Sequence, residues 1–282
     1  MQTLRNIRSL LKETYDEWHK QKPEILGAAL AFYIIFSLGP VLVITTGIVD
    51  FLLGGNTAES EIVQQIHTLI GPKPADVIRS LIAEAYAPPA KYLTTIISIP
   101  LIVFGSGMIF FQLRNTLFIV WGIPRRRSRK IIGFLKSYAI SFSLVMVLGA
   151  ILFFLIAKSI ALAMLDDFII QYISVPFSLL RTADSIATFG IVTVLFALVY
   201  KILLHEHVTW PNAWVGALGT SFLFTVGQVC IGLYLSMTDI DTAYGALGSV
   251  TVLVIWIFYS AQIFLVGAVF TRVHGKRGAG RG

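Results

Sequence analysis

The chain has 282 residues, of which 56% are hydrophobic and only 13% are charged, and its formal net charge is +7. Soluble domains carry about 25% charged residues, so this composition excludes an ordinary soluble protein and indicates an integral membrane protein. The single cysteine, Cys230, excludes an intrachain disulfide and is interpreted as a packing residue.

The N-terminal segment, residues 1–24, carries apolar residues at helical spacing with basic residues between them. The pattern predicts an amphipathic helix whose apolar positions are Leu4, Ile7, Leu10, Leu11, Tyr15 and Trp18. Two placements agree with it: a helix lying on the cytoplasmic membrane surface, or a helix packed on the base of the protein's own bundle.

Six stretches after this segment are apolar enough to span a bilayer, which requires about 20 residues. They lie at roughly residues 25–49, 92–113, 137–157, 185–200, 212–236 and 246–271, and the fourth is short unless it continues to Leu204. The expected fold class is therefore all-α: a polytopic membrane protein with a six-helix transmembrane domain over residues 25–271. Residues 272–282 are predicted to form a basic cytoplasmic tail.

Two connecting segments carry structure of their own. The first outside loop, residues 51–91, has two short apolar faces separated by Gly and Pro, which predict a helical hairpin. These faces consist of Ile62, Val63, Ile66, Leu69 and Ile70, and of Val77, Ile78, Leu81 and Ile82. Residues 168–180 are too short and interrupted to span, so they indicate an interfacial or re-entrant piece.

Basic residues predict the orientation. Seventeen of the 22 lysine and arginine residues fall in the N-terminal segment, the C-terminal tail and the loops on the same side as these. Cytoplasmic segments carry the excess of Lys and Arg, so both termini are predicted to be cytoplasmic. The basic residues adjoin spans, which favours anionic lipid headgroups at the cytoplasmic face as partners over nucleic acid. Association into a homo-oligomer stays open.

Polar side chains near the end of the second span are the strongest candidates for a functional site. Gln112, Arg114 and Asn115 interrupt otherwise apolar sequence. If the span starts at Tyr92, they lie at the cytoplasmic headgroups. If it starts near Ile99, Arg114 is about 10 Å inside the bilayer. Polar residues inside a membrane are a default functional hypothesis.

Other spans supply partners for this group. Gln228 in the fifth span, with Tyr259 and Gln262 in the sixth, is predicted to face it and complete an intramembrane polar pathway. Gly105 and Gly107 precede the group and are a candidate hinge, because two glycines loosen a helix. The alternative is that the amides only join helices.

Enzymatic chemistry has little support in the sequence. The His205–Glu206–His207 cluster is short and has no further ligand cluster nearby, so it is interpreted as a polar loop. No catalytic residue, metal site or cofactor is predicted. Small residues four apart predict close helix packing; they are Gly27 and Ala31, Gly216 and Thr220, and Gly245 and Ser249.

Three stretches carry a resemblance to a known family. They are GAALAFYIIFSLGPVLV in span one, WPNAWVGALGTSFLF leading into span five, and AYGALGSVTVLVIWIFYSAQIFLVGAVFTRV at 243–273. The chain resembles the YihY/BrkB family of bacterial inner-membrane proteins, which implies six spans. Family members often carry Glu where this chain has Val269, and Asn where it has Phe118, so roles of those groups are not assigned here.

The family's functional labels conflict: some members were called a tRNA-processing ribonuclease, others are linked to serum resistance, and transport of ions or amphiphiles has been proposed. A ribonuclease requires an acid–base pair or metal ligands beside a phosphate-binding surface, and this chain offers neither. The sequence therefore favours transport or permeation of a small ion or an amphiphile such as a lipid, without ATP hydrolysis. A non-transporting scaffold or partner-binding protein is the alternative, and a ribonuclease is disfavoured.

Overall fold

A computed structural model describes residues 2–53, 63–64, 66–67, 71–85, 111–124, 177–204, 207–238 and 248–279. Within these ranges every regular element is a helix, which confirms the all-α prediction for this part of the chain. The helices are α1 (Gln2–Lys20), α2 (Pro23–Leu53), α4 (Pro72–Ala85), α7 (Phe177–Leu204), α8 (Trp210–Met237) and α10 (Gly248–Ala279). A further helix covers residues 111–121.

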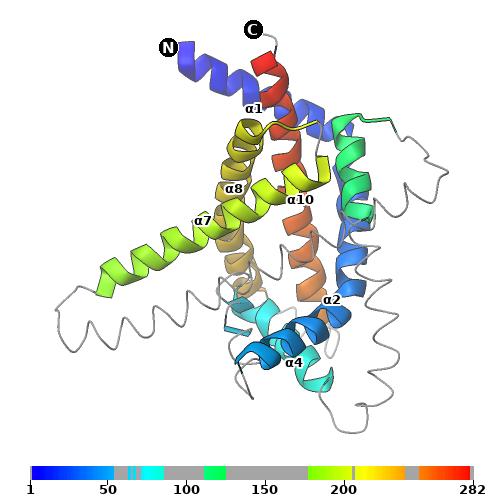
Figure 1. Ribbon diagram of the computed structural model, residues 1–282, viewed down its shortest axis with the longest axis vertical. Coiled ribbons are helices and arrows are strands. Elements are labelled where there is room, and N and C mark those ends of the chain that lie inside the picture. The colour runs from blue at the N-terminus through cyan, green and yellow to red at the C-terminus, as the bar shows by residue number, and fades with distance from the viewer. Residues whose placement is uncertain are drawn as a thin grey trace.

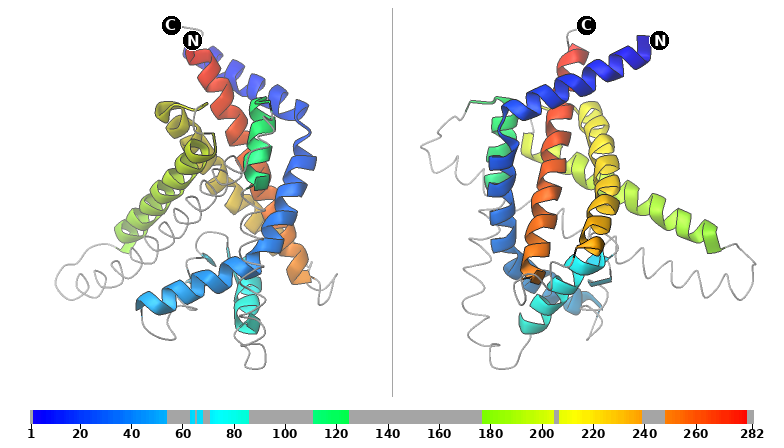
Figure 2. Two further views of the ribbon diagram at one scale, coloured as in Figure 1. Left: turned by 45° about the vertical axis from the view of Figure 1, so that its right-hand side comes forward. Right: turned by 180° about the vertical axis from the view of Figure 1, so that it is seen from behind.

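The arrangement is built around α10. This helix packs against α8, α2, α1 and α4 (Figure 1). The first half of α2, α8 and α10 run along one another, whereas α7 crosses them obliquely and packs against α8. The amphipathic helix α1 runs across one end of the bundle, beside the C-terminal end of α10, and α4 lies at the opposite end (Figure 2).

Three described helices are long and apolar enough to cross a membrane: Asp184–Leu204, Trp210–Leu235 and Val250–Arg277. They confirm the fourth, fifth and sixth predicted spans as helices of spanning length, and the fourth does continue to Leu204. The segment predicted as a tail is partly helical, because α10 continues to Ala279. Gly105, Gly107, the third predicted span and most of the second lie outside the described residues.

The first predicted span corresponds to α2, which changes direction part of the way along its length (Figures 1 and 2). Pro40 lies near the middle of this helix. Proline removes a backbone hydrogen bond and is the commonest cause of a sharp kink. The helix is 31 residues long and contains the whole stretch, 25–49, that the sequence predicts as the first span.

The piece predicted to be interfacial, residues 168–180, ends inside a longer helix. Its last four residues are the first turn of α7, which continues without a break to Leu204. Residues 168–176 lie outside the described residues, so the interfacial placement of that part stays a prediction.

The predicted hairpin in the first loop is confirmed in its second half as α4. Its apolar side packs with Val63 and Ile66 against α2 and α10; the buried members of this cluster are Ala31, Val63, Val77, Ile78, Ile82, Leu253 and Ile257. Lys73, in the first turn of α4, donates from Nζ to the carbonyl oxygen of Leu235 at 2.7 Å. That carbonyl belongs to the last turn of α8, whose final carbonyl groups have no partner within the helix. The lysine thus joins α4 to α8.

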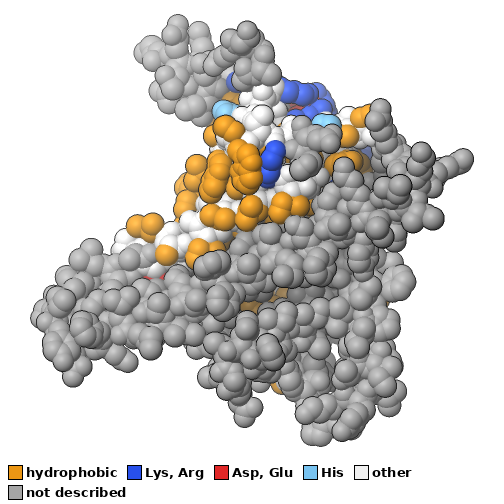
Figure 3. All heavy atoms as spheres, viewed as in Figure 1, with side chains coloured by type: hydrophobic (Ala, Val, Ile, Leu, Met, Phe, Trp, Pro, Cys, Tyr) orange, Lys and Arg blue, Asp and Glu red, His pale blue; other side chains and the backbone are white. Residues whose placement is uncertain are grey.

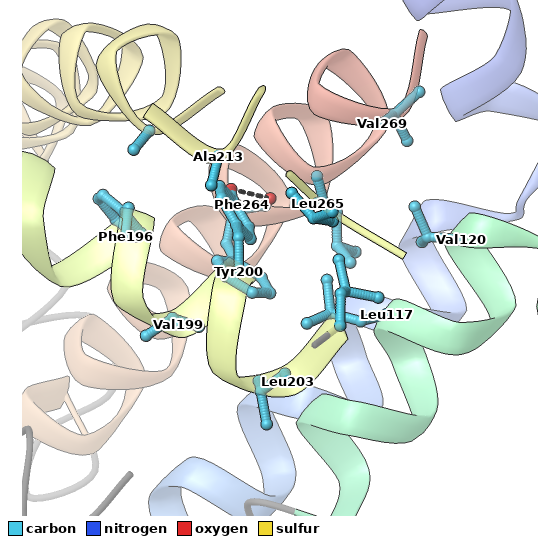
Figure 4. Packing of buried hydrophobic residues seen from close by; sticks show 14 of the residues in the cluster. Leu117, Val120, Phe196, Val199, Tyr200, Leu203, Ala213, Phe264, Leu265 and Val269 are labelled. Atoms are coloured by element: carbon cyan, nitrogen blue, oxygen red, sulfur yellow. Dashed lines mark hydrogen bonds between the residues drawn. The ribbon is translucent and has the colours of Figure 1, made fainter. Parts of the chain in front are cut away.

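The principal core lies between α7, α8, α10 and the 111–121 helix (Figure 4). Tyr200 is fully buried there, and its hydroxyl lies 2.9 Å from Thr220 Oγ1 and donates to the carbonyl oxygen of Phe264 at 3.1 Å. Two close approaches bring α8 and α10 together: a methyl group at Gly216 would overlap the Thr271 side chain, and one at Gly267 would overlap Thr220. The packing role predicted for the Gly216–Thr220 pair is therefore confirmed.

Apolar side chains also cover the outside of the described bundle. Figure 3 shows hydrophobic side chains gathered over part of α7 and α8. On α8 the exposed large apolar residues are Trp210, Trp214, Val215, Leu218, Phe222, Leu223, Val226, Val229, Leu233, Tyr234 and Met237. A soluble protein rarely exposes so continuous an apolar face, whereas a membrane helix presents one to lipid.

Candidate functional site

The helical segment described over residues 111–121 carries the polar group singled out in the sequence. It packs through Leu113, Leu117 and Val120 into the principal core. Its end is a Schellman motif: the Ile123 amide donates to the Phe118 carbonyl oxygen, and the Gly122 amide to that of Ile119, both at 2.9 Å. Gly122 has a φ of +65°, the left-handed conformation that this motif requires and glycine adopts without cost.

The three polar side chains of this helix have different surroundings. Gln112 donates from Nε2 to Thr116 Oγ1 at 3.4 Å, one turn further along. Arg114 is partly buried and places its guanidinium carbon 4.9 Å from the centre of the Phe118 ring. Such a cation–π contact partly offsets the cost of removing the charge from water. Asn115 Oδ1 is buried and has no hydrogen-bond donor among the described residues.

Gln262 on α10 is used to join helices. Its Nε2 donates to the carbonyl oxygen of Pro23 at 2.9 Å, at the start of α2. The amide occupies the space beside Gly27, where any larger side chain would overlap it. Its other polar atom, Oε1, is buried and accepts no hydrogen bond from the described part of the chain. Gln262 therefore joins two helices through its Nε2 atom, while its Oε1 atom accepts no hydrogen bond from the described residues.

Tyr259 lies at the boundary between α8 and α10. A methyl group at Gly227 on α8 would lie 3.0 Å from Tyr259 Cε1, so the tyrosine ring packs directly on that glycine. Gln228, the next residue, is partly buried. The predicted residues are thus spread over three surfaces: the 111–121 helix, the α2–α10 contact and the α8–α10 contact.

Aromatic side chains fill the space between α7, α8 and α10. The ring centroids of Tyr200 and Phe264 are 5.3 Å apart, those of Phe196 and Phe264 are 6.3 Å apart, and those of Phe196 and Phe224 are 5.8 Å apart. Tyr200, Phe196 and Phe264 are all buried. Apolar rings therefore fill the described contact between α7, α8 and α10.

Arg272 is an important residue that sequence reasoning treated only as a topology signal. Its Nη1 donates to Glu17 Oε1 on α1 at 2.9 Å and to the carbonyl oxygen of Val120 at 2.7 Å. A positive charge at a helix C-terminus is favourable, because the last carbonyl groups carry partial negative charge. Arg272 therefore holds α1, α10 and the 111–121 helix together. No local pattern signals this contact, since Glu17 and Arg272 are 255 residues apart.

The metal-like cluster of the sequence is only partly described. His207 lies with its ring centroid 6.5 Å from that of Phe118, edge to face, whereas His205 and Glu206 fall outside the described residues. The described ranges contain no group of three or more metal-ligating side chains.

Comparisons with known proteins agree with the fold and composition. The family model for virulence factor BrkB matches residues 14–281. A UPF0761 membrane protein of Glaesserella parasuis is 27% identical over 77% of this chain and 73% of its own length. Those of Pseudoalteromonas translucida and Mannheimia succiniciproducens are 27% and 24% identical over 86% and 95% of this chain, and over 78% and 90% of their own lengths.

No solved structure matches this chain. The matched residues extend across all the described helices from within α1 to α10 and include the 111–121 helix. The chain is a membrane protein that belongs to the YihY/BrkB family.

Proposed function

We propose that this protein is a six-span, multi-pass protein of the bacterial inner membrane, with both termini cytoplasmic, which moves a small ion or an amphiphile across the bilayer without hydrolysing ATP. The three described spanning helices and the one-sided distribution of Lys and Arg support the topology.

The observation that carries the transport proposal is a pair of buried amide oxygens. Asn115 Oδ1 and Gln262 Oε1 lie in or beside predicted spans, and neither accepts a hydrogen bond from the described residues. A buried polar group without a partner costs about 1–3 kcal/mol. This cost is offset when the oxygen accepts a hydrogen bond from a solute or a water molecule that passes through the protein. Polar groups inside membranes mark such pathways.

Charge indicates the class of solute. Arg114 lies one residue before Asn115 on the same helix. The sequence within residues 25–38, 111–121, 185–204, 210–237 and 250–271 contains no Asp or Glu. A cation pathway usually relies on intramembrane carboxylates, so this composition favours an anionic solute or an anionic lipid headgroup. Cation exchange is the less favoured version of the same proposal.

The test is a flux assay in reconstituted vesicles. Wild-type protein is expected to release trapped anions or to scramble fluorescent anionic lipid faster than protein-free vesicles. Arg114→Gln and Gln262→Leu should each reduce the rate at unchanged folding and reconstitution. Arg79→Gln is the matched control, because Arg79 is an exposed arginine on α4, at the other end of the bundle. Absence of flux and scrambling in wild type, or full activity in both site variants, would contradict the proposal.

A scaffold without transport activity is the second candidate, and one observation favours it. The amide of Gln262 donates to the carbonyl oxygen of Pro23 and so joins α10 to α2. A stable protein partner in native membranes, together with no flux in vesicles, would establish this alternative.

We propose no catalytic activity for this protein. Metal-dependent tRNA cleavage by the purified protein, lost when His205→Ala and His207→Ala are introduced together, would contradict this.

A further inference from the structure

The amphipathic helix α1 is held directly before α2, the helix that corresponds to the first predicted span. Only Gln21 and Lys22 separate its last residue, Lys20, from the first residue of α2, Pro23. The corner is fixed, because Lys22 adopts a left-handed backbone with φ of 49°, and its carbonyl oxygen accepts from the Ile25 amide at 3.0 Å. The helix runs across the end of the bundle instead of extending along it (Figures 1 and 2).

One side of α1 is used by the protein itself. Thr14 is 4% exposed, and Leu10 and Trp18 pack against the principal core. Two carboxylates on this side pair with arginines of α10: Glu17 accepts from Arg272, and Glu13 Oε2 accepts from Arg277 Nε at 2.9 Å. The bonds to α10 thus draw two of the three acidic residues of α1 towards the bundle.

A neighbouring side of α1 is apolar and exposed. Leu11 and Tyr15 are 57% and 62% exposed, and residues four apart lie on the same helix face. Arg8 and Lys12, also four apart, are exposed and lie beside them. Around the helix axis, Lys12 is offset from the middle of that apolar pair by about 80° and Arg8 by about 40°. Asp16 is the exposed carboxylate that remains, and it lies one turn beyond Lys12. The exposed surface is therefore apolar along Leu11 and Tyr15, with two basic residues beside this pair and one acidic residue further round the helix.

We infer that this surface of α1 docks on the anionic phospholipids of the cytoplasmic leaflet, with Leu11 and Tyr15 entering the headgroup layer and Arg8 and Lys12 binding lipid phosphates. An apolar stripe beside Lys and Arg is the pattern of helices that lie in the membrane interface. A second copy of the chain fits less well, because a symmetric contact through this face would bring the basic residues of both copies together. This inference concerns anchoring and does not depend on whether the protein transports anything.

The experiment places one fluorophore on full-length protein in lipid nanodiscs. In a Cys230→Ser background, the probe is attached to Leu11→Cys or, as the matched control, to Asp16→Cys. Nanodiscs contain phosphatidylcholine and phosphatidylglycerol, and the quenchers are water-soluble acrylamide or lipid brominated near the headgroup. The Leu11 probe should be quenched by brominated lipid and shielded from acrylamide, whereas the Asp16 probe should show the reverse.

Charge is tested in the same protein by comparing quenching by brominated phosphatidylglycerol and brominated phosphatidylcholine. Arg8→Gln with Lys12→Gln should lower the local preference for phosphatidylglycerol by at least fivefold, since one basic residue near an anionic surface contributes about that factor, or about 1 kcal/mol. Arg79→Gln should leave the preference unchanged. Equal acrylamide access at Leu11 and Asp16 would overturn the inference. The inference would also be overturned if the Leu11 probe were shielded from both quenchers and Tyr15→Cys formed disulfide-linked dimers.

Discussion

Arg272 Nη1 lies 2.7 Å from the carbonyl oxygen of Val120, so a charged side chain of α10 caps the C-terminus of the 111–121 helix. The same nitrogen binds Glu17 on α1. The helix that carries Arg114 and Asn115 is thereby fixed at its end to both α10 and α1. If Arg114 and Asn115 move relative to α10, the bond between Arg272 and Val120 must either break or move with them.

Loss of the arginine should therefore destabilise the fold. Arg272→Met removes the bonds to Glu17 and Val120, and hydrogen bonds to charged groups contribute about 1.5–3 kcal/mol. Because the pair is partly exposed, at 13% and 27% for the two side chains, we expect the free energy of unfolding of the detergent-solubilised protein to fall by about 2 kcal/mol. Arg277→Met is the control, since its pair with Glu13 is more exposed, at 31% and 50%, and should cost less than about 1 kcal/mol. Equal losses would contradict the special role of Arg272.

The close contact between α8 and α10 makes a second prediction. A Cβ atom at Gly216 would lie 2.8 Å from Thr271 Cβ, and overpacking of this kind costs about 1–3 kcal/mol. Gly216→Ala should therefore lower the unfolding midpoint, and Thr271→Ala should partly restore it. Gly232→Ala on the same helix has nothing within 4 Å and should be neutral or slightly stabilising. A neutral Gly216→Ala would show that α8 and α10 do not approach so closely.

The buried hydroxyl network can be tested at Tyr200. Tyr200 and Thr220 have two hydroxyl hydrogens for three contacts, namely with each other, with the Phe264 carbonyl and with the Gly216 carbonyl. Tyr200→Phe removes one hydrogen and one acceptor but keeps the ring stack, so we expect a loss of about 1 kcal/mol. Tyr234→Phe, at a position that is 53% exposed, should have no measurable effect. Equal unfolding midpoints for the two variants would contradict the network.

The proposed topology is tested by reporter fusions. Fusions after Gly55 and Asp166 should be active only with a reporter that works outside the cytoplasm, and fusions after Arg127 and Gly278 only with a cytoplasmic reporter. The expectation rests on the positive charge bias of the segments concerned. An external C-terminus would exclude the six-span arrangement with both ends inside.

Long apolar stretches were sufficient to predict the helices α8 and α10, and small-residue spacing predicted that Gly216 and Thr220 allow a close helix contact, because both signals are local and periodic. The sequence did not indicate that α10 is the helix that makes this contact. For α1 the structure confirms packing on the bundle, through Leu10 and Trp18. Leu11 and Tyr15 are exposed, and their contact with the membrane surface stays a prediction. Periodicity identifies an apolar face but cannot show which of its residues contact protein and which contact lipid.

The candidate site was harder to predict. Sequence reasoning gathered the intramembrane amides into one group, yet Gln262 binds Pro23, 239 residues away. Which neighbour an amide meets depends on how helices distant in sequence are packed, and no local pattern encodes that. The contact of Arg272 with Glu17 was missed for the same reason. Whether Asn115 and Gln262 line one pathway stays a prediction.

The central claim is that the buried polar atoms beside α10 line a route across the membrane. The most direct test is chemical modification of Asn115→Cys in a Cys230→Ser background, with a membrane-impermeant thiol reagent applied separately to each side of oriented vesicles. Leu117→Cys is the control, because Leu117 is 0% exposed in the apolar core. The account predicts that Asn115→Cys reacts from both sides and that Leu117→Cys reacts from neither. Reaction from the cytoplasmic side alone, or none at all, would contradict it.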